Sequence, residues 1–336
     1  EISECLVGSE MCIRDRIYNN AQLMGKIDLP THISTSFRFI ASISTFDYYK
    51  KDKLFSRNDK PSFNSKDERF VKLMVALPFL ANKRAEFSLG YGQLEDNYFQ
   101  SSVIDFDKDR SDRSTYKLLG GSIGFYGSTL NTRQYATKGY LEKLIAQVFT
   151  GRERFEPGNP QEGYSPSPQE RQSWLQISYM KEAYHTMGPK FTLGWMAEAL
   201  YSSKNFSENY TATMMQAGEF APTPHSKLMY NEAFRANQYV AAGIKPIYVL
   251  NDMFQFRTEF YGFTPIFPIK KNALNKAYYG KAFSRFEYMG EVSVICHLPF
   301  GAISAYVNHY SSPRREWNVG MTIGWQLSLI HISEPT

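Results

Sequence analysis

Apolar and polar residues alternate with a period of two along much of the chain. The clearest case is 318–327, where Val319, Met321 and Ile323 alternate with small or polar residues. Successive side chains of a β-strand point to opposite faces, so this pattern places an apolar face opposite a polar one. A strand that meets lipid on one side and a wet interior on the other has this pattern.

The same alternation, in stronger or weaker form, predicts about twelve strands, each near the ~9–11 residues of a tilted membrane strand. They are 36–45, 70–80, 85–92, 115–128, 140–150, 174–184, 191–199, 239–249, 254–261, 284–294, 301–310 and 318–327. Lys, Arg and Glu fall mostly on the polar phase of these segments. A soluble core seldom tolerates so many charges on one inner face, whereas a water-filled or plugged lumen does.

The connections between these strands alternate between short and long. The short ones are 80–84, 131–140, 185–190, 250–253 and 297–301, and the long ones are 50–67, 95–114, 151–173, 202–237, 264–281 and 311–317. Bacterial outer-membrane barrels have short periplasmic turns and longer outer loops. We therefore predict an all-β fold, an antiparallel up-and-down transmembrane β-barrel, in the outer membrane of a Gram-negative bacterium.

Composition agrees with this fold but does not by itself distinguish it from an array of soluble β-sandwiches. Aromatic residues make up 15% of the 336 residues, with 23 Tyr and 25 Phe. The formal net charge is +5 without an obvious basic patch, so nucleic acid is not indicated as a partner. The strict alternation of short and long connections favours the barrel.

Candidate chemistry in the sequence is weak. Residues 120–124 match the G-x-S-x-G nucleophile elbow, but the strand pattern continues through Phe125 and no amphipathic helix follows. We interpret the match as small residues on a barrel strand. The three cysteines form no CxxC pair, and the six histidines are not spaced as metal ligands. We expect no catalytic residue, no cofactor and no metal site in this chain.

Both ends of the chain differ from the rest. Residues 1–16 and 328–336 resemble translated sequencing-adapter DNA, and we expect both to be artefacts. The barrel segment is then 17–327. No signal peptide is visible, as expected if the true N-terminus lies upstream.

The segment 131–140, NTRQYATKGY, resembles the periplasmic hairpin of the BamA/TamA-type barrel superfamily. Gly139 suits a turn position with positive φ, and Asn131 and Arg133 have side chains that hydrogen-bond turn backbones. Ala136 replaces the proline of the family pattern. The last predicted hairpin also resembles that superfamily. The resemblance implies closure by sixteen strands, so the readable strands are a partial barrel that leaves two unpaired edges.

Three further segments, 173–182, 201–206 and 302–310, resemble the barrel of patatin-like phospholipases of Bacteroidota. That resemblance implies a patatin hydrolase domain and a POTRA-like domain upstream in the same chain, with outer-membrane lipid and the barrel-assembly machinery as further partners. The barrel then anchors the hydrolase, or helps to translocate it, and holds no catalytic residue itself.

Two alternatives remain open. The first is a BamA/TamA-type protein insertion or translocation barrel without an enzyme domain, which the upstream sequence would distinguish. The second is a passive porin, which more often has a constriction loop rich in paired charges. The long connection 202–237 is instead nearly neutral and contains Met214, Met215 and Met229.

The connection 202–237 corresponds to a loop that folds into the lumen in the BamA/TamA-type superfamily and carries an R-G-F/Y motif. In the segment 233–237, AFRAN, only Phe and Arg agree with that motif. We predict that Arg235 reaches the inner wall and pairs with a lumen-facing carboxylate, for which Glu259 is the best candidate. A charge pair in a confined lumen is stronger than one at the surface.

Overall fold

A computed structural model describes residues 18–29, 35–48, 64–100, 109–132, 134–159, 171–224, 226–228, 230–299, 301–312 and 317–325. The expected artefacts, 1–16 and 328–336, lie outside the described residues, and so does Arg133. No helix within these ranges is long and apolar enough to cross a membrane.

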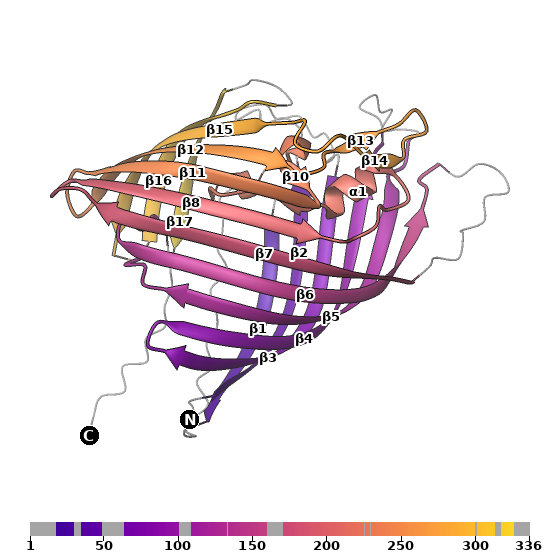
Figure 1. Ribbon diagram of the computed structural model, residues 1–336, viewed down its shortest axis with the longest axis horizontal. Coiled ribbons are helices and arrows are strands. Elements are labelled where there is room, and N and C mark those ends of the chain that lie inside the picture. Colours follow the sequence, from indigo (N-terminus) through magenta and orange to yellow (C-terminus); the bar gives the residue numbers. More distant parts are fainter. Residues whose placement is uncertain are drawn as a thin grey trace.

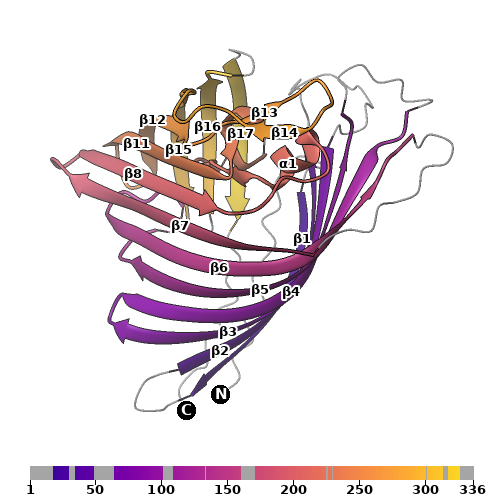
Figure 2. The same cartoon turned by 45° about the vertical axis from the view of Figure 1, so that its right-hand side comes forward.

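The described residues form one antiparallel sheet of 13 strands, in which each strand pairs with the sheet strands that precede and follow it in the chain. Its strands are β1 (Tyr18–Leu29), β2 (Thr35–Tyr48), β3 (Asn64–Leu80), β4 (Lys83–Tyr98), β5 (Asp112–Ser128), β6 (Gly139–Glu156), β7 (Arg171–Thr186), β8 (Phe191–Ser202), β11 (Gln238–Val249), β12 (Phe254–Pro265), β15 (Glu287–Leu298), β16 (Gly301–Tyr310) and β17 (Trp317–Trp325). The sheet curves around an interior (Figures 1 and 2). Within the described residues, β1 and β17 are the two edges and each pairs on one side only. The predicted up-and-down antiparallel fold is confirmed.

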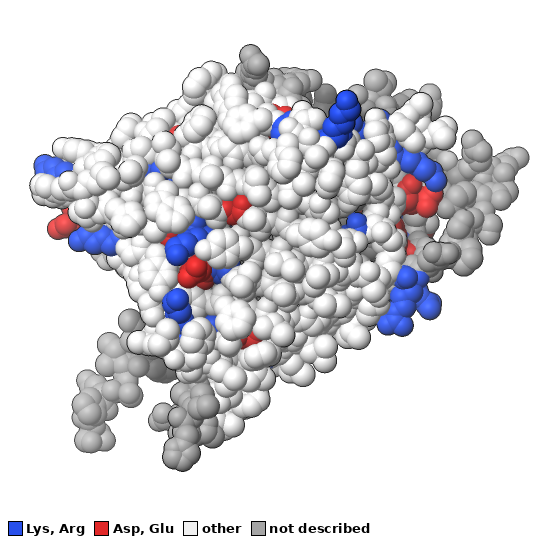
Figure 3. All heavy atoms as spheres, in the orientation of Figure 1, with Lys and Arg blue, Asp and Glu red and all other residues white. Residues whose placement is uncertain are grey.

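The two faces of the sheet differ as the alternation predicts. Along β12, Phe254, Phe256 and Phe260 are exposed, whereas Gln255 and Arg257 between them are buried. The same holds around the sheet, whose outer face exposes many large apolar side chains. Figure 3 shows one such face, where charged groups gather mostly toward the two ends of the strands. An apolar band between charged margins is the surface that a barrel presents to a bilayer.

The predicted strands all lie in the sheet, but their limits and number needed correction. The sequence analysis missed β1, which carries Leu23, Ile27 and Leu29 on its outer face beside the region that we set aside. Strands β3 and β6 extend well beyond their predicted ends. The extensions carry polar residues on both faces, because a strand that leaves the membrane meets water on both sides.

The two longest described connections contain structure of their own. The connection after β8 holds α1 (Tyr210–Gln216), two short 3₁₀ turns, η1 (Ser226–Leu228) and η2 (Glu232–Phe234), and the paired strands β9 (Gly218–Glu219) and β10 (Arg235–Ala236). The connection after β12 forms a hairpin of β13 (Ile269–Lys271) and β14 (Ala277–Tyr279). Met214 and Ala217 pack with Ile269, so α1 lies against this hairpin.

Candidate functional site in the barrel interior

The connection 203–237, called here the inner loop, folds into the interior and packs on one side of the wall. Phe220 and Phe234 are 1% and 2% exposed. The Phe220 ring stacks on Phe263 of β12 at 5.9 Å between centroids, and the Phe234 ring meets Tyr310 of β16 at 5.9 Å. Full burial of a phenylalanine contributes about 1.5–3 kcal/mol. The predicted entry of this loop into the lumen is confirmed.

The opposite side of the wall holds the first half of the inner loop by polar contacts. Asn209 caps α1, because its Oδ1 accepts a hydrogen bond from Ala212 N at 2.9 Å. The Asn209 Nδ2 donates to the hydroxyl of Tyr98 on β4 at 2.8 Å. The hydroxyls of Ser207 and Tyr116 lie 2.5 Å apart, which adds a contact to β5. The inner loop thus joins two distant parts of the sheet across the interior.

Lys204 lies at the beginning of the inner loop with its side chain buried. Its Nζ is 4.5 Å from the ring centroid of Tyr116 and 5.1 Å from that of Trp174, so two aromatic faces contact the ammonium. Burial lowers the pKa of Lys204 to about 8, although the carboxylates of Glu153 and Asp96 act in the opposite direction. The amine of Lys204 therefore loses its proton at a lower pH than the amine of an exposed lysine.

Arg235 has a different carboxylate beside it from the one that we predicted. Its Nη2 is 2.7 Å from Oε2 of Glu219, because β10 pairs with β9 and places Arg235 opposite Glu219. The guanidinium also donates from Nη1 to the carbonyl oxygen of Met215 at 3.1 Å and lies 4.8 Å from the ring centroid of Tyr230. The predicted partner Glu259 is corrected to Glu219, a residue of the same loop.

Glu259 lies on the inner wall, as its phase predicts, and pairs there with a residue of its own strand. Its Oε1 is 3.0 Å from Arg257, and its Oε2 accepts a hydrogen bond from the Tyr261 hydroxyl at 2.5 Å. Residues two apart on a strand share a face, so Arg257 was the nearer candidate in the sequence. Lys245 and Glu182, 2.7 Å apart, form a second ion pair on the inner wall.

The short connection 129–138, called here the crossing turn, confirms two local predictions. The Oδ1 of Asn131 accepts hydrogen bonds from the backbone N–H groups of Thr137 and Lys138, at 3.0 and 3.1 Å. Gly139 has a φ of +90°, and a Cβ there would lie 2.1 Å from the carbonyl oxygen of Thr129. Only glycine fits this position without a shift of the backbone.

The crossing turn also reaches the far side of the interior, which the sequence analysis did not foresee. The Tyr135 hydroxyl donates to Ser304 of β16 at 2.8 Å. Arg257 donates from Nη1 to the carbonyl oxygen of Ala136 at 2.9 Å, and Ala136 is buried. Gln255 donates to the carbonyl oxygen of Tyr135 at 3.2 Å. These partners are far apart in sequence, so no local pattern indicated them.

The segment 120–124 lies within β5, which runs without interruption to Ser128. The hydroxyls of Ser122 and Ser88 are 2.6 Å apart, across the β4–β5 pair. A nucleophile elbow needs a sharp turn into a helix, and this strand has none. Within the described residues, no three His, Cys, Asp or Glu side chains lie close enough together to hold a metal ion.

Comparison with known proteins finds no matching family model and no matching curated protein. The structure is similar to BamA from Haemophilus ducreyi lacking POTRA domains 1-3, with a TM-score of 0.57 and 12% identity over 93% of this chain. This chain spans 63% of that structure, less than two thirds of its length. For CdiB from Acinetobacter baumannii the TM-score is 0.47 and the identity 8%, with 92% of this chain and 50% of that one covered. The fold shared with BamA and the apolar outer face of the sheet together identify the chain as an outer-membrane β-barrel.

Proposed function

We propose that this barrel anchors a patatin-like phospholipase domain of the same protein in the outer membrane, or helps to translocate it. The anchoring role is supported by the contacts that join distant strands across the barrel interior. The inner loop joins β4 and β5 to β12 and β16, and the crossing turn joins β5 and β6 to β12 and β16. These contacts across the interior stabilise the wall to which the proposed hydrolase domain would be attached.

The phospholipase part of the proposal rests on the resemblance of 173–182, 201–206 and 302–310 to the barrels of patatin-like phospholipases. The enzyme chemistry belongs to the hydrolase domain that this resemblance implies. The barrel contributes attachment to the membrane, where the lipid substrate of such an enzyme lies. The partners proposed with it are outer-membrane lipid, the barrel-assembly machinery and the POTRA-like domain.

A BamA/TamA-type insertion or translocation barrel is the second candidate, and the fold shared with BamA favours it. Such a barrel would carry POTRA domains and no hydrolase. The buried aromatic cluster of Phe220, Phe234 and Phe263 counts against the third candidate, a passive porin, because apolar packing replaces water in that part of the lumen.

The deciding experiment is recovery of the DNA upstream of this reading frame. We expect a G-x-S-x-G elbow and a D-G-[AG] partner in the same frame, followed by a POTRA-like segment. Serine-to-alanine substitution in that elbow should then abolish phospholipase activity of the outer-membrane fraction and leave the barrel folded. POTRA repeats without an elbow would overturn the phospholipase proposal and support the translocation barrel.

A further inference from the structure

A row of charged residues crosses the lipid-facing side of the sheet. Glu142 of β6 lies opposite Lys181 of β7 in the strand register, and Gly127 of β5 lies opposite both Glu142 and Lys83 of β4. All four positions are on the outward phase, the phase of the exposed Leu144 on β6. Charged side chains on the lipid face are disfavoured unless they lie near the membrane border or have a partner there.

On β6, β7 and β8, a second row that includes two aromatic residues lies between the charged row and the short turns. Ala183 of β7 lies opposite Tyr140 on one side and Trp195 on the other, so a small residue is flanked by two rings. Tyrosine and tryptophan mark the border between hydrocarbon and headgroups. Glu142 and Lys181 are two positions farther from the turns than this border, and Lys83 lies directly beside its turn.

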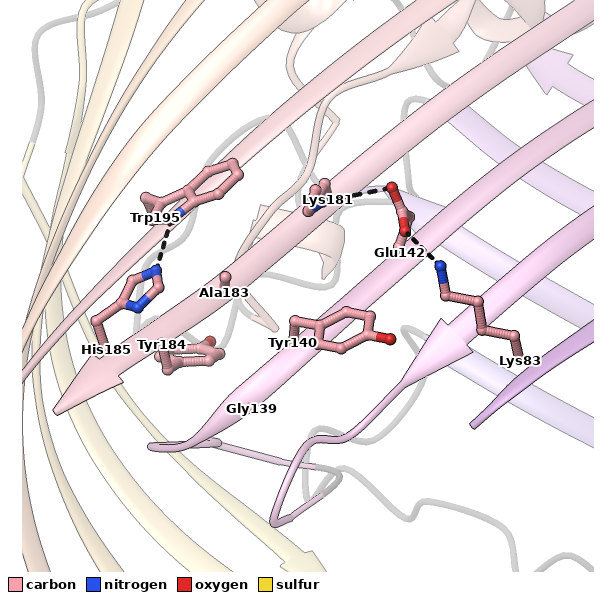
Figure 4. Close-up of a pocket in the computed structure, with 9 residues that line it drawn as sticks. All are labelled: Lys83, Gly139, Tyr140, Glu142, Lys181, Ala183, Tyr184, His185 and Trp195. Atoms are coloured by element: carbon pink, nitrogen blue, oxygen red, sulfur yellow. Dashed lines mark hydrogen bonds and ion pairs between the residues drawn. The ribbon is translucent and has the colours of Figure 1, made fainter. Parts of the chain in front are cut away.

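The two rows line an open hollow of about 510 Å³ on the outer face. Figure 4 shows the Glu142 carboxylate between the ends of Lys83 and Lys181, with Tyr140, Trp195 and His185 around them. The ion pairs are long, 3.9 Å from Lys83 and 3.5 Å from Lys181. A charge-assisted hydrogen bond is about 2.7–2.9 Å, so both ammonium groups have N–H donors left for another anion.

We propose that this hollow binds one glycerophospholipid with a phosphate and a primary amine in its headgroup, as in phosphatidylethanolamine. The phosphate oxygens accept hydrogen bonds from Lys83 and Lys181. The lipid ammonium donates to Glu142, whose carboxylate already accepts one from the Tyr179 hydroxyl at 3.0 Å. A hollow with both signs of charge fits a headgroup with both signs better than a purely anionic one.

An apolar groove deeper in the same face fits the acyl chain of that lipid. The groove has a volume of about 580 Å³ and is lined by Leu73, Phe87, Gly121, Ile123, Ala146 and Val148. From Glu142 to Val148, at the far end of the groove on β6, is about 20 Å along the strand at ~3.3 Å per residue, or about 14 Å of depth for a strand tilted by about 45°. One leaflet of the hydrocarbon core is about 15 Å thick, so headgroup and groove lie within a single leaflet. Because the hollow lies at the short turns, this is the periplasmic leaflet.

The test measures lipid binding to the folded, purified barrel in detergent by native mass spectrometry, with phosphatidylethanolamine, phosphatidylcholine and phosphatidylglycerol of identical acyl chains. We expect phosphatidylethanolamine to bind on the order of tenfold more tightly than phosphatidylcholine, whose quaternary ammonium has no N–H donor. Lys83→Gln with Lys181→Gln should lower the affinity for both on the order of tenfold. Glu142→Gln should remove the preference for the primary amine.

The matched control is Arg154→Gln with Glu156→Gln, a charged pair on the outward phase of the same strand at its other end. This variant should bind like the wild type. Gly121→Leu should weaken all three lipids, because a Cβ at Gly121 meets only ordinary contact and the longer side chain fills the groove. Heat-modifiability on gels verifies that each variant is folded.

Equal binding of phosphatidylethanolamine and phosphatidylcholine by the wild type would overturn the proposal, as would tighter binding of phosphatidylglycerol. Unchanged affinity in the double lysine variant would also overturn it. The site depends only on the outer face of the barrel being in lipid. Its failure is therefore distinct from failure of the phospholipase proposal, which the upstream sequence decides.

Discussion

The crossing turn and the inner loop both occupy the interior, but they are held in different ways. The crossing turn owes its shape to its own backbone, through the Asn131 side chain and the positive φ of Gly139. The inner loop owes its position to side chains of distant strands, such as Tyr98 and Phe263. A local motif specifies the first, whereas a distributed set of contacts specifies the second. A single substitution in the crossing turn should therefore prevent folding, whereas a single substitution in the inner loop should remove only part of the stability.

The largest effect is expected at Gly139. In Gly139→Val, the new Cβ would meet the Thr129 carbonyl oxygen at 2.1 Å in a backbone conformation that β-branched residues avoid. Backbone strain of about 1–3 kcal/mol adds to an overlap that only movement of the turn relieves. We expect no folded barrel, measured as loss of the heat-modifiable species on gels.

Gly188 provides the matched control, because it lies in another short turn and a Cβ there would have nothing within 4 Å. Gly188→Ala should leave the amount of folded barrel unchanged. A Gly139→Val variant that folds as well as Gly188→Ala would show that the crossing turn is not specified locally.

The second prediction compares the buried arginines of the wall and of the loop. Arg257→Met removes the ion-pair partner of the Glu259 carboxylate, whose side chain is 9% exposed, and the hydrogen bond to Ala136, and leaves only the Tyr261 hydroxyl on that carboxylate. Loss of one partner from a buried pair costs about 3–5 kcal/mol. Arg235→Met should cost less, because the side chain of Glu219 is 24% exposed and water solvates it in part.

Urea unfolding of the barrel in vesicles measures the loss of stability in both variants. The double variant Glu259→Gln with Arg257→Met shows how much of the larger loss comes from the buried Glu259 charge that has lost its arginine. The double variant should recover part of the lost stability. If Arg235→Met is destabilised more than Arg257→Met, the arginine of the inner loop contributes more stability than the arginine of the wall, contrary to this prediction.

The third prediction concerns the aromatic contacts of the inner loop. Phe234→Ala should lower the free energy of unfolding by about 3 kcal/mol, at the lower end of values for buried phenylalanine, because the loop has room to collapse. Leu274→Ala in the hairpin of β13 and β14 is the control, since Leu274 is 80% exposed. Protease cleavage within the inner loop should increase in the first variant only. Equal cleavage in both would show that the cluster does not hold the loop.

The same contrast between local and distributed information explains how much of the fold the sequence revealed. Period-two alternation found the strands wherever one face meets lipid, because the bilayer imposes an apolar phase. It did not find the polar extensions of β3 and β6. In β1 the alternation of Leu23 and Ile27 with Gln22 and Lys26 was present in the sequence, and the sequence analysis did not use it.

For the candidate site, the sequence revealed what neighbouring residues determine. It indicated the Asn131 and Gly139 geometry, the inward phase of Glu259 and the entry of the inner loop into the lumen. It did not indicate that Arg235 would meet Glu219, because that contact depends on the β9–β10 pair, which is too short to leave a pattern. Nor could a local motif show that the crossing turn reaches β12 and β16.

The smallest effect is a pH dependence carried by the inner loop. Lys204 binds its proton less tightly in the folded barrel, where its pKa is about 8, than in the unfolded chain, where it is near 10.5. Between these values the unfolded state holds more protons, so stability rises with pH by up to ~1.4 kcal/mol per unit. Below about pH 7 both states are protonated and this contribution is constant. Above about pH 10 the trend reverses, because burial raises the pKa of Tyr210 to about 12.

Urea unfolding at pH 7, 8 and 9 measures this contribution as the difference between the wild type and Lys204→Gln. The wild type should gain about 1 kcal/mol relative to the variant between pH 8 and pH 9, and only about 0.4 kcal/mol between pH 7 and pH 8. Lys276→Gln, at a lysine whose side chain is 63% exposed, should keep the slope of the wild type. A slope in Lys204→Gln equal to that of the wild type would mean that the ammonium is not buried against Tyr116 and Trp174. The polar side of the inner loop would then be held by Asn209 and Ser207, without a contribution from the lysine.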